Sequence, residues 1–299
     1  MPDPVRYDQC PVCGGPHIGP LFWIHDHSVT KEAFVIWQCA DCTLRFTQNA
    51  PAAGDIGRYY QSEEYISHSD TQKGLVNKLY IQARKFTIAQ KLKGVQELTG
   101  KTTGNLLDVG CGTGSFLAAA KAGGWNIAGV EPDEGARRTA RELNGVTAFA
   151  AEQFYELPPQ SFDAITLWHV LEHVHDLHRY MQQLKNLLKK DGRLFIAVPN
   201  YNSADATAYG SWWAAYDVPR HLYHFTPKAV QALAQKHGFV IHRQKPMLLD
   251  AFYISLLSSK YRHGRTAWIS AGFNGLRSTL WALIKPQQAS SVIYVLGKD

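Results

Sequence analysis

From residue 105 onward, short apolar runs alternate with longer helical patterns. The runs predict five strands, at 105–109, 127–131, 146–150, 162–168 and 193–199. Amphipathic periodicity predicts the helices between them, at 115–123, 134–143 and 177–189. A further helix is predicted at 227–237, followed by strands from 239 and at 291–296. This alternation favours an α/β fold with a doubly wound, mostly parallel sheet of seven strands.

The N-terminal segment carries two Cys-x-x-Cys pairs instead of this alternation. The cysteines are Cys10, Cys13, Cys39 and Cys42. Four thiolates in this pattern favour a closed tetrahedral shell around a structural Zn²⁺. Three histidines between the pairs are alternative ligands: His17, His25 and His27. The apolar run at 34–37 predicts a strand before the second pair, so residues 1–48 are expected to form a small zinc ribbon.

A glycine-rich turn at 106–117 follows the first strand of the alternating region and reads L-L-D-V-G-C-G-T-G-S-F-L. Glycines at alternate positions let bare backbone approach a ligand closely, and Ser115 is expected to cap the next helix. The dinucleotide fingerprint would need a third glycine where Ser115 or Leu117 stands. A P-loop would need a lysine that the stretch lacks.

The remaining spacing, D-x-G-x-G-x-G, closely resembles the first motif of the class I S-adenosylmethionine-dependent methyltransferases. The resemblance implies a Rossmann-like domain whose glycine turn faces the methionyl end of S-adenosylmethionine. A carboxylate at the end of the second strand, Glu131, is expected to accept the ribose hydroxyls, and Glu152 or Gln153 the adenine amino group. The candidate cofactor-binding residues are Asp108, Gly110, Cys111, Gly112, Gly114, Glu131, Pro132, Glu152, Gln153 and Trp168.

Two histidine-containing segments carry the candidate acid–base chemistry. The segment 168–174, W-H-V-L-E-H-V, resembles the H-V-L-E-H stretch of many small-molecule methyltransferases of this class. The segment 219–225, P-R-H-L-Y-H-F, ends a long aromatic loop. Methyl transfer to an aliphatic hydroxyl requires a base, and histidine suits that role near neutral pH. The candidate bases are His221, His224 and His169; Arg220 is expected to pair either with an anionic substrate or with Asp217.

The expected organisation has three parts. They are a zinc-ribbon module at 1–48, a linker and cover helix at 49–100, and a methyltransferase domain at 101–299 with substrate-covering insertions at 200–225 and 250–290. In the cover segment a helix is predicted over 75–98, and its basic side is interpreted as a solvated face. The apolar positions expected to bury its other face are Leu75, Leu79, Ala83, Phe86 and Ile88. Three tyrosines, Tyr59, Tyr60 and Tyr65, either line the cover or pack internally. The resemblance also places an antiparallel edge strand at 291–296.

The C-terminal segment 250–284 contains two apolar helical stretches flanked by arginines and a lysine. Core or lid packing and interfacial contact with a membrane are the two interpretations. The N-terminus lacks the apolar region of a signal peptide, and no apolar run is long enough to span a bilayer, so a cytoplasmic protein is expected. Contact through 250–284 would place it at the inner face of the membrane.

The charge balance narrows the function classes. The chain has 31 Lys and Arg against 25 Asp and Glu, a net charge of +6, without a run of five like charges, so nucleic-acid binding is not required. The Cys₄ module together with the P-R-H-L-x-H-F pattern resembles a bacterial branch that acts on small molecules and includes sugar methyltransferases and ubiquinone-type O-methyltransferases. The leading hypothesis is therefore an O-methyltransferase acting on a small-molecule, glycan or lipid-linked acceptor. The alternatives are a zinc-guided RNA or DNA methyltransferase and a non-catalytic cofactor-binding module. An Asn/Asp-Pro-Pro-Tyr element, which the former would favour, is absent after the fourth strand.

Overall fold

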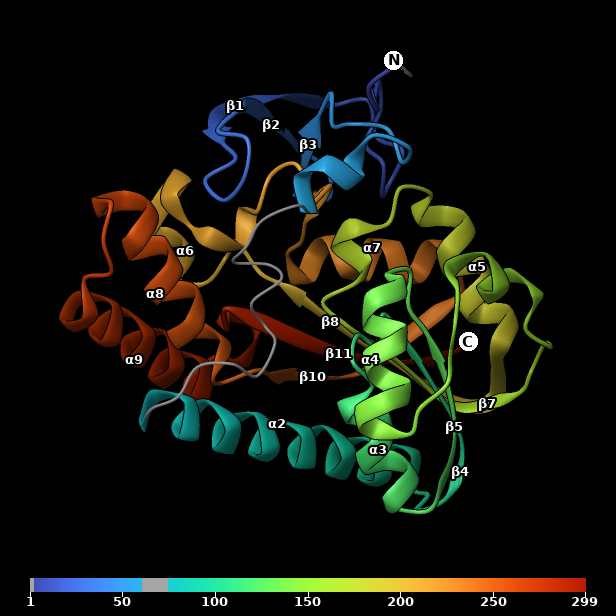
Figure 1. Ribbon diagram of the computed structural model, residues 1–299. Helices are drawn as coiled ribbons and strands as arrows, with labels where there is room; N and C mark the ends of the chain where they lie inside the picture. The colour runs from blue at the N-terminus through green and yellow to red at the C-terminus, as the bar shows by residue number, and fades with distance from the viewer. Residues whose placement is uncertain (1–2, 61–74) are drawn as a thin grey trace.

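The computed structural model describes residues 3–60 and 75–299, and two sheets organise them (Figure 1). The larger sheet has seven strands in the order β10-β11-β8-β7-β4-β5-β6. Their bounds are β4 Gly104–Val109, β5 Trp125–Val130, β6 Ala148–Phe149, β7 Phe162–Trp168, β8 Leu188–Pro199, β10 Phe239–Pro246 and β11 Ser291–Lys298. β4, β5, β6, β7 and β8 pair in parallel, whereas β11 is antiparallel to both of its neighbours. The expected doubly wound, mostly parallel sheet is confirmed.

The periodicity correctly predicts four helices that alternate with the strands. They are α3 (Ser115–Ala122), α4 (Glu134–Asn144), α5 (Leu177–Leu187) and α7 (Pro227–Lys236). In α5 the buried residues recur at helical spacing, at positions 177, 181, 184 and 187. Thr226 caps α7 by accepting a hydrogen bond from the Ala229 N–H. The corresponding expectation for α3 is wrong, because the helix begins at Ser115 itself and its cap position is the left-handed Gly114.

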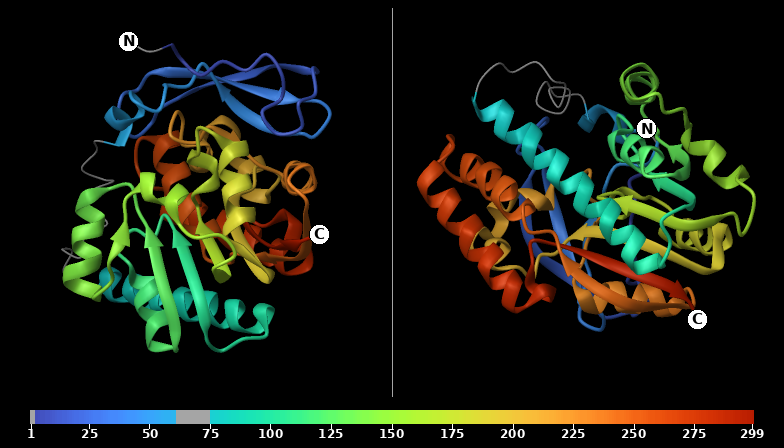
Figure 2. Two further views of the ribbon diagram at one scale, coloured as in Figure 1. Left: turned by 90° about the vertical axis from the view of Figure 1, so that its right-hand side faces the viewer. Right: turned by 90° about the horizontal axis from the view of Figure 1, so that it is seen from below.

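The smaller sheet lies over the larger domain on the side away from α2 (Leu75–Thr99), as Figures 1 and 2 show. Its antiparallel strands are β1 (Ile18–His25), β2 (Ala33–Cys39), β3 (Arg45–Gln48) and β9 (Tyr223–His224). β9 comes from the aromatic segment that was expected to be a loop. That segment instead forms α6 (Ala204–Tyr209), two short 3₁₀ turns and then β9, so it completes the N-terminal sheet.

The C-terminal part consists of α8 (Asp250–His263), α9 (Trp268–Ile284) and β11. β11 does not lie at the sheet edge, because β10 pairs with its outer side. Six of its eight residues are buried, as expected of a strand inside a sheet with both faces covered. No helix among the described residues is long and apolar enough to cross a membrane.

Helix α2 packs against the larger domain through Ile88, Leu92 and Val95. Phe86, which the periodicity had assigned to the buried face, is 58% exposed instead. The two side chains that began the predicted apolar face, Leu75 and Leu79, and the predicted cover residue Tyr65 lie outside the described side chains.

A buried guanidinium joins the N-terminal segment to the segment that leads into β9. Arg220 is only 2% exposed and contacts Asp217 through Nε and Nη2, at 2.9 and 2.5 Å, and Asp26 of the small domain at 3.2 Å. Its Nη1 also donates to the Tyr59 carbonyl oxygen at 2.7 Å. Burial opposes charge on Asp217, but Arg220 outweighs burial and lowers the pKa of that carboxyl. Of the two roles left open for Arg220, the structure therefore supports the internal ion pair.

We expect Arg220→Leu to lower the free energy of unfolding by about 3–5 kcal/mol, because it leaves the buried Asp26 and the partly buried Asp217 without their cation. The matched control is Arg58→Leu, which removes an exposed ion pair with Glu32 and should cost about 0–1 kcal/mol. Urea unfolding followed by tryptophan fluorescence measures both. An equal loss of unfolding free energy in the two variants would show that the ion pairs of Arg220 do not hold the N-terminal segment in place.

Candidate active site and zinc centre

The glycine turn leaves β4 and enters α3 with three left-handed residues: Gly110, Gly112 and Gly114 have φ of 72°, 53° and 76°. A Cβ at Gly110 would lie 2.5 Å from a methyl carbon of Val170, so this position has no room for a side chain. At Gly112, by contrast, an added Cβ would meet nothing within 4 Å. The turn is therefore packed against the protein on one side and open at Gly112, which suits a ligand lying against bare backbone.

Glu131 stands directly after β5 and holds the turn in place. One carboxylate oxygen accepts from the Gly112 N–H at 2.8 Å, and the other accepts from the Asp133 N–H at 3.0 Å. Burial raises the pKa of this carboxyl, against the lowering effect of both N–H groups. Since each carboxylate oxygen has two lone-pair sites, Glu131 can still accept hydroxyl groups from a ligand.

Asp108, the penultimate residue of β4, is almost fully buried and accepts from the Thr166 hydroxyl at 2.6 Å. Burial raises the pKa of Asp108 to about 7. Nearby, the Lys91 ammonium from α2 lies 4.4 Å above the ring of Trp168. The indole N–H of Trp168 is buried and has no hydrogen-bond partner among the described residues. Such a donor is expected where a polar ligand accepts its hydrogen bond.

Two cations from α2 were not identified from the sequence, where the basic positions of this helix were interpreted as a solvated face. Lys91 lies at the site, and Arg84 donates to the Ser115 and Thr113 hydroxyls at 2.9 and 3.2 Å. Helical spacing was the available signal, because Lys91 is three residues after Ile88 and four before Val95, on the same buried face.

The other predicted cofactor residues that follow β4, β5 and β6 make contacts with the protein itself. Cys111 is buried beneath it, close to Gly129 of β5. The Pro132 carbonyl accepts from Arg137. Gln153 uses its side-chain oxygen to accept from the Ala150 N–H, which ties it to its own 3₁₀ turn. The choice between Glu152 and Gln153 as the adenine partner stays open.

His169, at the end of β7, lies between two carboxylates. Its Nε2 is 2.9 Å from Asp250, the first residue of α8, and its Nδ1 is 3.3 Å from Glu172. Burial alone would lower the pKa of His169, but the bonds to Asp250 and Glu172 outweigh it and raise the pKa to about 10. A histidine that already carries a proton is a poor proton acceptor at neutral pH, so this geometry suits a positioning role.

His221 lies in a second group, with Glu172 and His173. A ligand atom of each lies within 4.8 Å of those of the other two, so this group could hold a cation. The His221 and His173 rings meet edge to face at 4.6 Å, and His221 Nδ1 is 2.8 Å from the Ala215 carbonyl oxygen. One oxygen of Glu172 is buried without a partner among the described residues.

The third candidate base, His224, lies apart from both groups. It sits on β9 in the small sheet, where its Nε2 is 3.2 Å from the Thr47 hydroxyl. Burial keeps the pKa of His224 well below the ordinary value. Thus the site brings together Asp108, the glycine turn, Glu131 and Trp168, with His169 and His221 beyond the end of β7.

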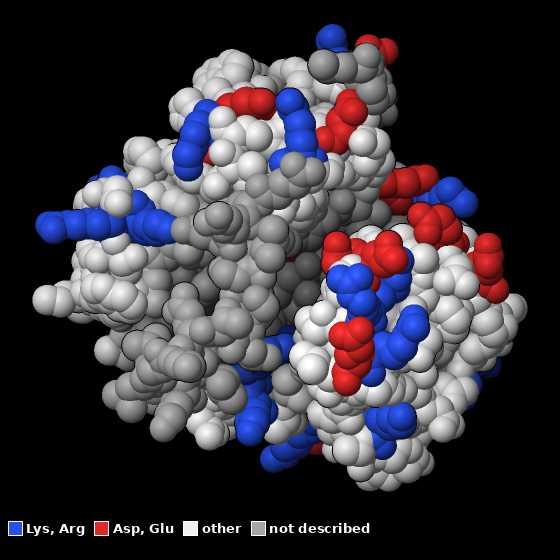
Figure 3. All heavy atoms as spheres, viewed as in Figure 1, with Lys and Arg blue, Asp and Glu red and all other residues white. Residues whose placement is uncertain are grey.

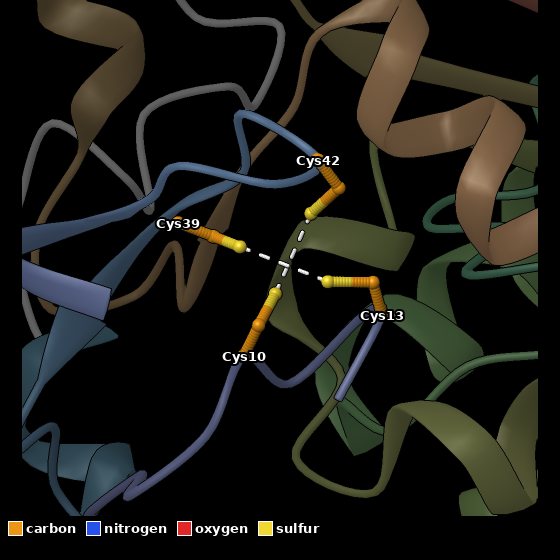
Figure 4. Close-up of side chains that lie close together, drawn as sticks. All are labelled: Cys10, Cys13, Cys39 and Cys42. Atoms are coloured by element: carbon orange, nitrogen blue, oxygen red, sulfur yellow. Dashed lines mark hydrogen bonds between the residues drawn. The ribbon is translucent and has the colours of Figure 1, made fainter. Parts of the chain in front are cut away.

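The four N-terminal cysteines converge in one cluster (Figure 4). Cys10 and Cys42 have their sulfurs 3.5 Å apart, and Cys13 and Cys39 have theirs 3.7 Å apart. Both separations exceed a disulfide bond of about 2.05 Å. They are close to the sulfur separation of about 3.8 Å that tetrahedral Zn–S bonds of about 2.3 Å require. The donor set therefore fits a zinc ion.

The histidines between the cysteine pairs have other partners. His17 pairs with Asp41 at 3.1 Å, and His25 contacts the Lys31 carbonyl oxygen at 3.2 Å. The ring of His27 stacks on Trp212 and Tyr261, with both centroid distances 4.9 Å.

Comparison with known proteins identifies the family. Residues 82–244, more than half of the chain, match the model of the family described as "Methyltransferase domain". The chain therefore belongs to this methyltransferase family.

Curated relatives include the ubiquinone biosynthesis O-methyltransferases of Neisseria meningitidis serogroup C and Actinobacillus pleuropneumoniae serotype 7. Their identity to the chain is 33% over 120 residues and 38% over 125 residues. The matched parts cover 37% and 38% of this chain, but only 49% and 50% of the relatives. The chain thus spans about half the length of the curated relatives it matches.

Among solved structures, magnesium protoporphyrin IX methyltransferase from Synechocystis, determined with bound SAH, shares the fold. The TM-score is 0.53 at 16% identity, and the match covers 82% of this chain and 100% of that one. It confirms the Rossmann-like methyltransferase architecture expected from the glycine turn and the alternating elements.

We expect Cys39→Ser to remove one of four sulfur ligands, and therefore to lower bound zinc from one equivalent per chain to well below one and to destabilise the small domain. The control is Cys111→Ser, which changes the one cysteine outside the cluster and should keep the metal. Metal analysis after dialysis against a weak chelator measures both. A full equivalent retained by Cys39→Ser would contradict the four-cysteine assignment.

Proposed function

We propose that this protein is an S-adenosylmethionine-dependent methyltransferase that methylates a hydroxyl of a small-molecule, glycan or lipid-linked acceptor. The observation that carries the proposal is the turn whose Gly112 is open to a ligand while its N–H is held by the carboxylate that follows β5. Membership of the methyltransferase family supports the reaction, and the ubiquinone biosynthesis O-methyltransferases among the relatives support oxygen as the atom methylated.

The donor set around the turn fits the proposed cofactor. When bound, S-adenosylmethionine supplies an activated methyl group on a sulfonium. Glu131 has lone pairs for the ribose hydroxyls, and the open backbone at Gly112 accommodates the amino-acid portion. Arg84 and Lys91 bring positive charge to the same end of the sheet, which suits a carboxylate group. In the proposal these residues bind and orient the cofactor, and they do not activate the methyl group.

The chain must also take a proton from the acceptor hydroxyl, and we assign this step to His221. Its Nδ1 faces the Ala215 carbonyl oxygen at 2.8 Å and so carries the hydrogen, which leaves Nε2 as the proton acceptor. Asp217 lies 3.9 Å from Nε2 and would stabilise the imidazolium that forms. His169, already protonated, and His224, bonded within the small sheet, suit this step less well.

The N-terminal module has a structural role in this proposal. Zinc held by the four cysteines would fix the small sheet, which β9 completes with residues from the methyltransferase domain. A closed shell of four sulfurs offers no open position for substrate. The module at 1–48 contacts Arg220 and pairs with β9, and it would therefore shape one side of the acceptor site. The segments around 200–225 and 250–290 would form the rest.

The function is tested by incubating the protein with methyl-labelled S-adenosylmethionine and lysate fractions enriched in sugars, lipids or RNA. We expect label in an alkali-stable ether of a sugar or lipid fraction. Gly112→Val should abolish the transfer and weaken cofactor binding by more than about a hundredfold, because the new side chain fills the open side of the turn. Calorimetry measures the binding.

The matched control is Gly145→Val, at the C-cap of α4. Gly145 has a φ of 60° and equally open surroundings, so the same substitution imposes the same backbone strain at a distance from the turn. It should lose a similar amount of stability and keep full affinity. Unchanged affinity in Gly112→Val would refute the cofactor placement, and label confined to RNA would refute the acceptor class.

We expect His221→Asn to lower kcat by about 10²–10⁴-fold while cofactor affinity stays within about twofold, because asparagine cannot take up the proton. His242→Asn, an exposed histidine on β10, is the control and should leave both parameters unchanged. A wild-type kcat retained by His221→Asn would assign the proton acceptor to another group.

A further inference from the structure

Helix α9 packs against the protein with its small residues, and its bulky apolar residues face solvent. Its buried residues are Ala271, Gly275, Ser278 and Ala282. A Cβ at Gly275 would lie 3.0 Å from the Phe252 backbone, so the inward face must be small for α9 to approach α8. The Ser278 hydroxyl donates to the buried Asp205 at 2.7 Å, which fixes the rotation of the helix.

The outward face of α9 is consequently a continuous apolar surface. Ile269 is 92% exposed, and Phe273 and Trp268 are each 66% exposed. Five further large apolar side chains on this face are exposed: Leu276, Leu280, Trp281, Leu283 and Ile284. Scattered exposed apolar residues are ordinary, but eight on one helix mark an interaction surface.

The charge around this surface has one sign. Between Asp250 and Asp299 the chain contains six Lys or Arg and no Asp or Glu. Four of them, Arg262, Arg265, Arg277 and Lys285, are exposed beside or within α9. At the left edge of Figure 3, outside the grey atoms, the surface is white and blue.

We propose that α9 is a docking surface for an anionic lipid bilayer, lying in the membrane interface with its apolar face inserted. Bulky apolar residues on one face and basic residues at its borders form the pattern that binds anionic interfaces. Trp268 and Trp281 lie near the two ends of the helix, and tryptophan favours the boundary between hydrocarbon and headgroups. At 17 residues α9 is shorter than a membrane span requires, and the proposal places it in the interface.

Charge decides between lipid and a second copy of this chain. A symmetric dimer through α9 would bring the basic residues of one copy close to those of the other with no acidic residue of this segment to pair with them, and like charges at an interface cost affinity. A bilayer that contains anionic headgroups instead neutralises the basic border. The proposal rests on exposure and charge, not on the methyl-transfer reaction, so it stands or falls separately from the proposed function.

The experiment is co-flotation of the full chain with vesicles of phosphatidylglycerol and phosphatidylcholine in equal amounts, and with phosphatidylcholine alone. We expect binding to the anionic vesicles that weakens as salt is raised. Phe273→Ser should weaken it by about tenfold, because one large apolar side chain no longer inserts. Arg277→Gln should weaken it by about fivefold, because one basic residue is lost.

Matched controls separate the surface from general effects. Leu143→Ser changes a 70% exposed leucine on α4, and Arg138→Gln changes a basic residue of the same helix; both should bind as the unaltered protein does. Thermal unfolding of all variants checks that they fold. Equal binding to neutral vesicles, or no binding to either kind, would overturn the proposal. A dimer that Phe273→Ser dissociates in sedimentation would overturn it in favour of a second copy.

Discussion

The buried guanidinium of Arg220 is the constraint on which the two-sheet arrangement depends. A charge removed from water is tolerated only when carboxylates and carbonyl groups replace its hydration, and here Asp217, Asp26 and the Tyr59 carbonyl do so. Asp26 and Tyr59 come from the N-terminal part of the chain and Asp217 from the segment before β9, so these contacts tie the N-terminal sheet to the segment 200–225. Because His221 follows Arg220 directly, the same contact also positions the proposed base.

Local pattern was sufficient to predict most of the large domain. The strands and helices between 104 and 199 follow from period and length, and the carboxyl ends of neighbouring parallel strands necessarily meet at one edge. Asp108 at the end of β4 and Glu131 after β5 could therefore be expected to converge on the glycine turn. The contact between Glu131 and the Gly112 N–H is the outcome of that geometry.

Contacts between distant segments could not be predicted in this way. His169 and Asp250 are 81 residues apart, and nothing near either residue indicates the other. The pairing of β9 with β3 likewise joins residues 223–224 to the N-terminal sheet, because two-residue strands carry no periodic signal. Lys91 differs, since its helical spacing did indicate a buried face; the general tendency of lysine to lie in solvent masked that signal.

The ion pair between His169 and Asp250 also connects the two proposals made for this protein. Asp250 is the first residue of α8, and α8 packs closely on α9 where Gly275 meets Phe252. His169 in turn follows β7, beside the glycine turn that Val170 contacts. An apolar helix bound to a bilayer would therefore hold the methyl-transfer site at a fixed height above the lipid, through one rigid chain of contacts. Under the two proposals taken together, this series of contacts would suit the lipid-linked acceptors among the proposed classes.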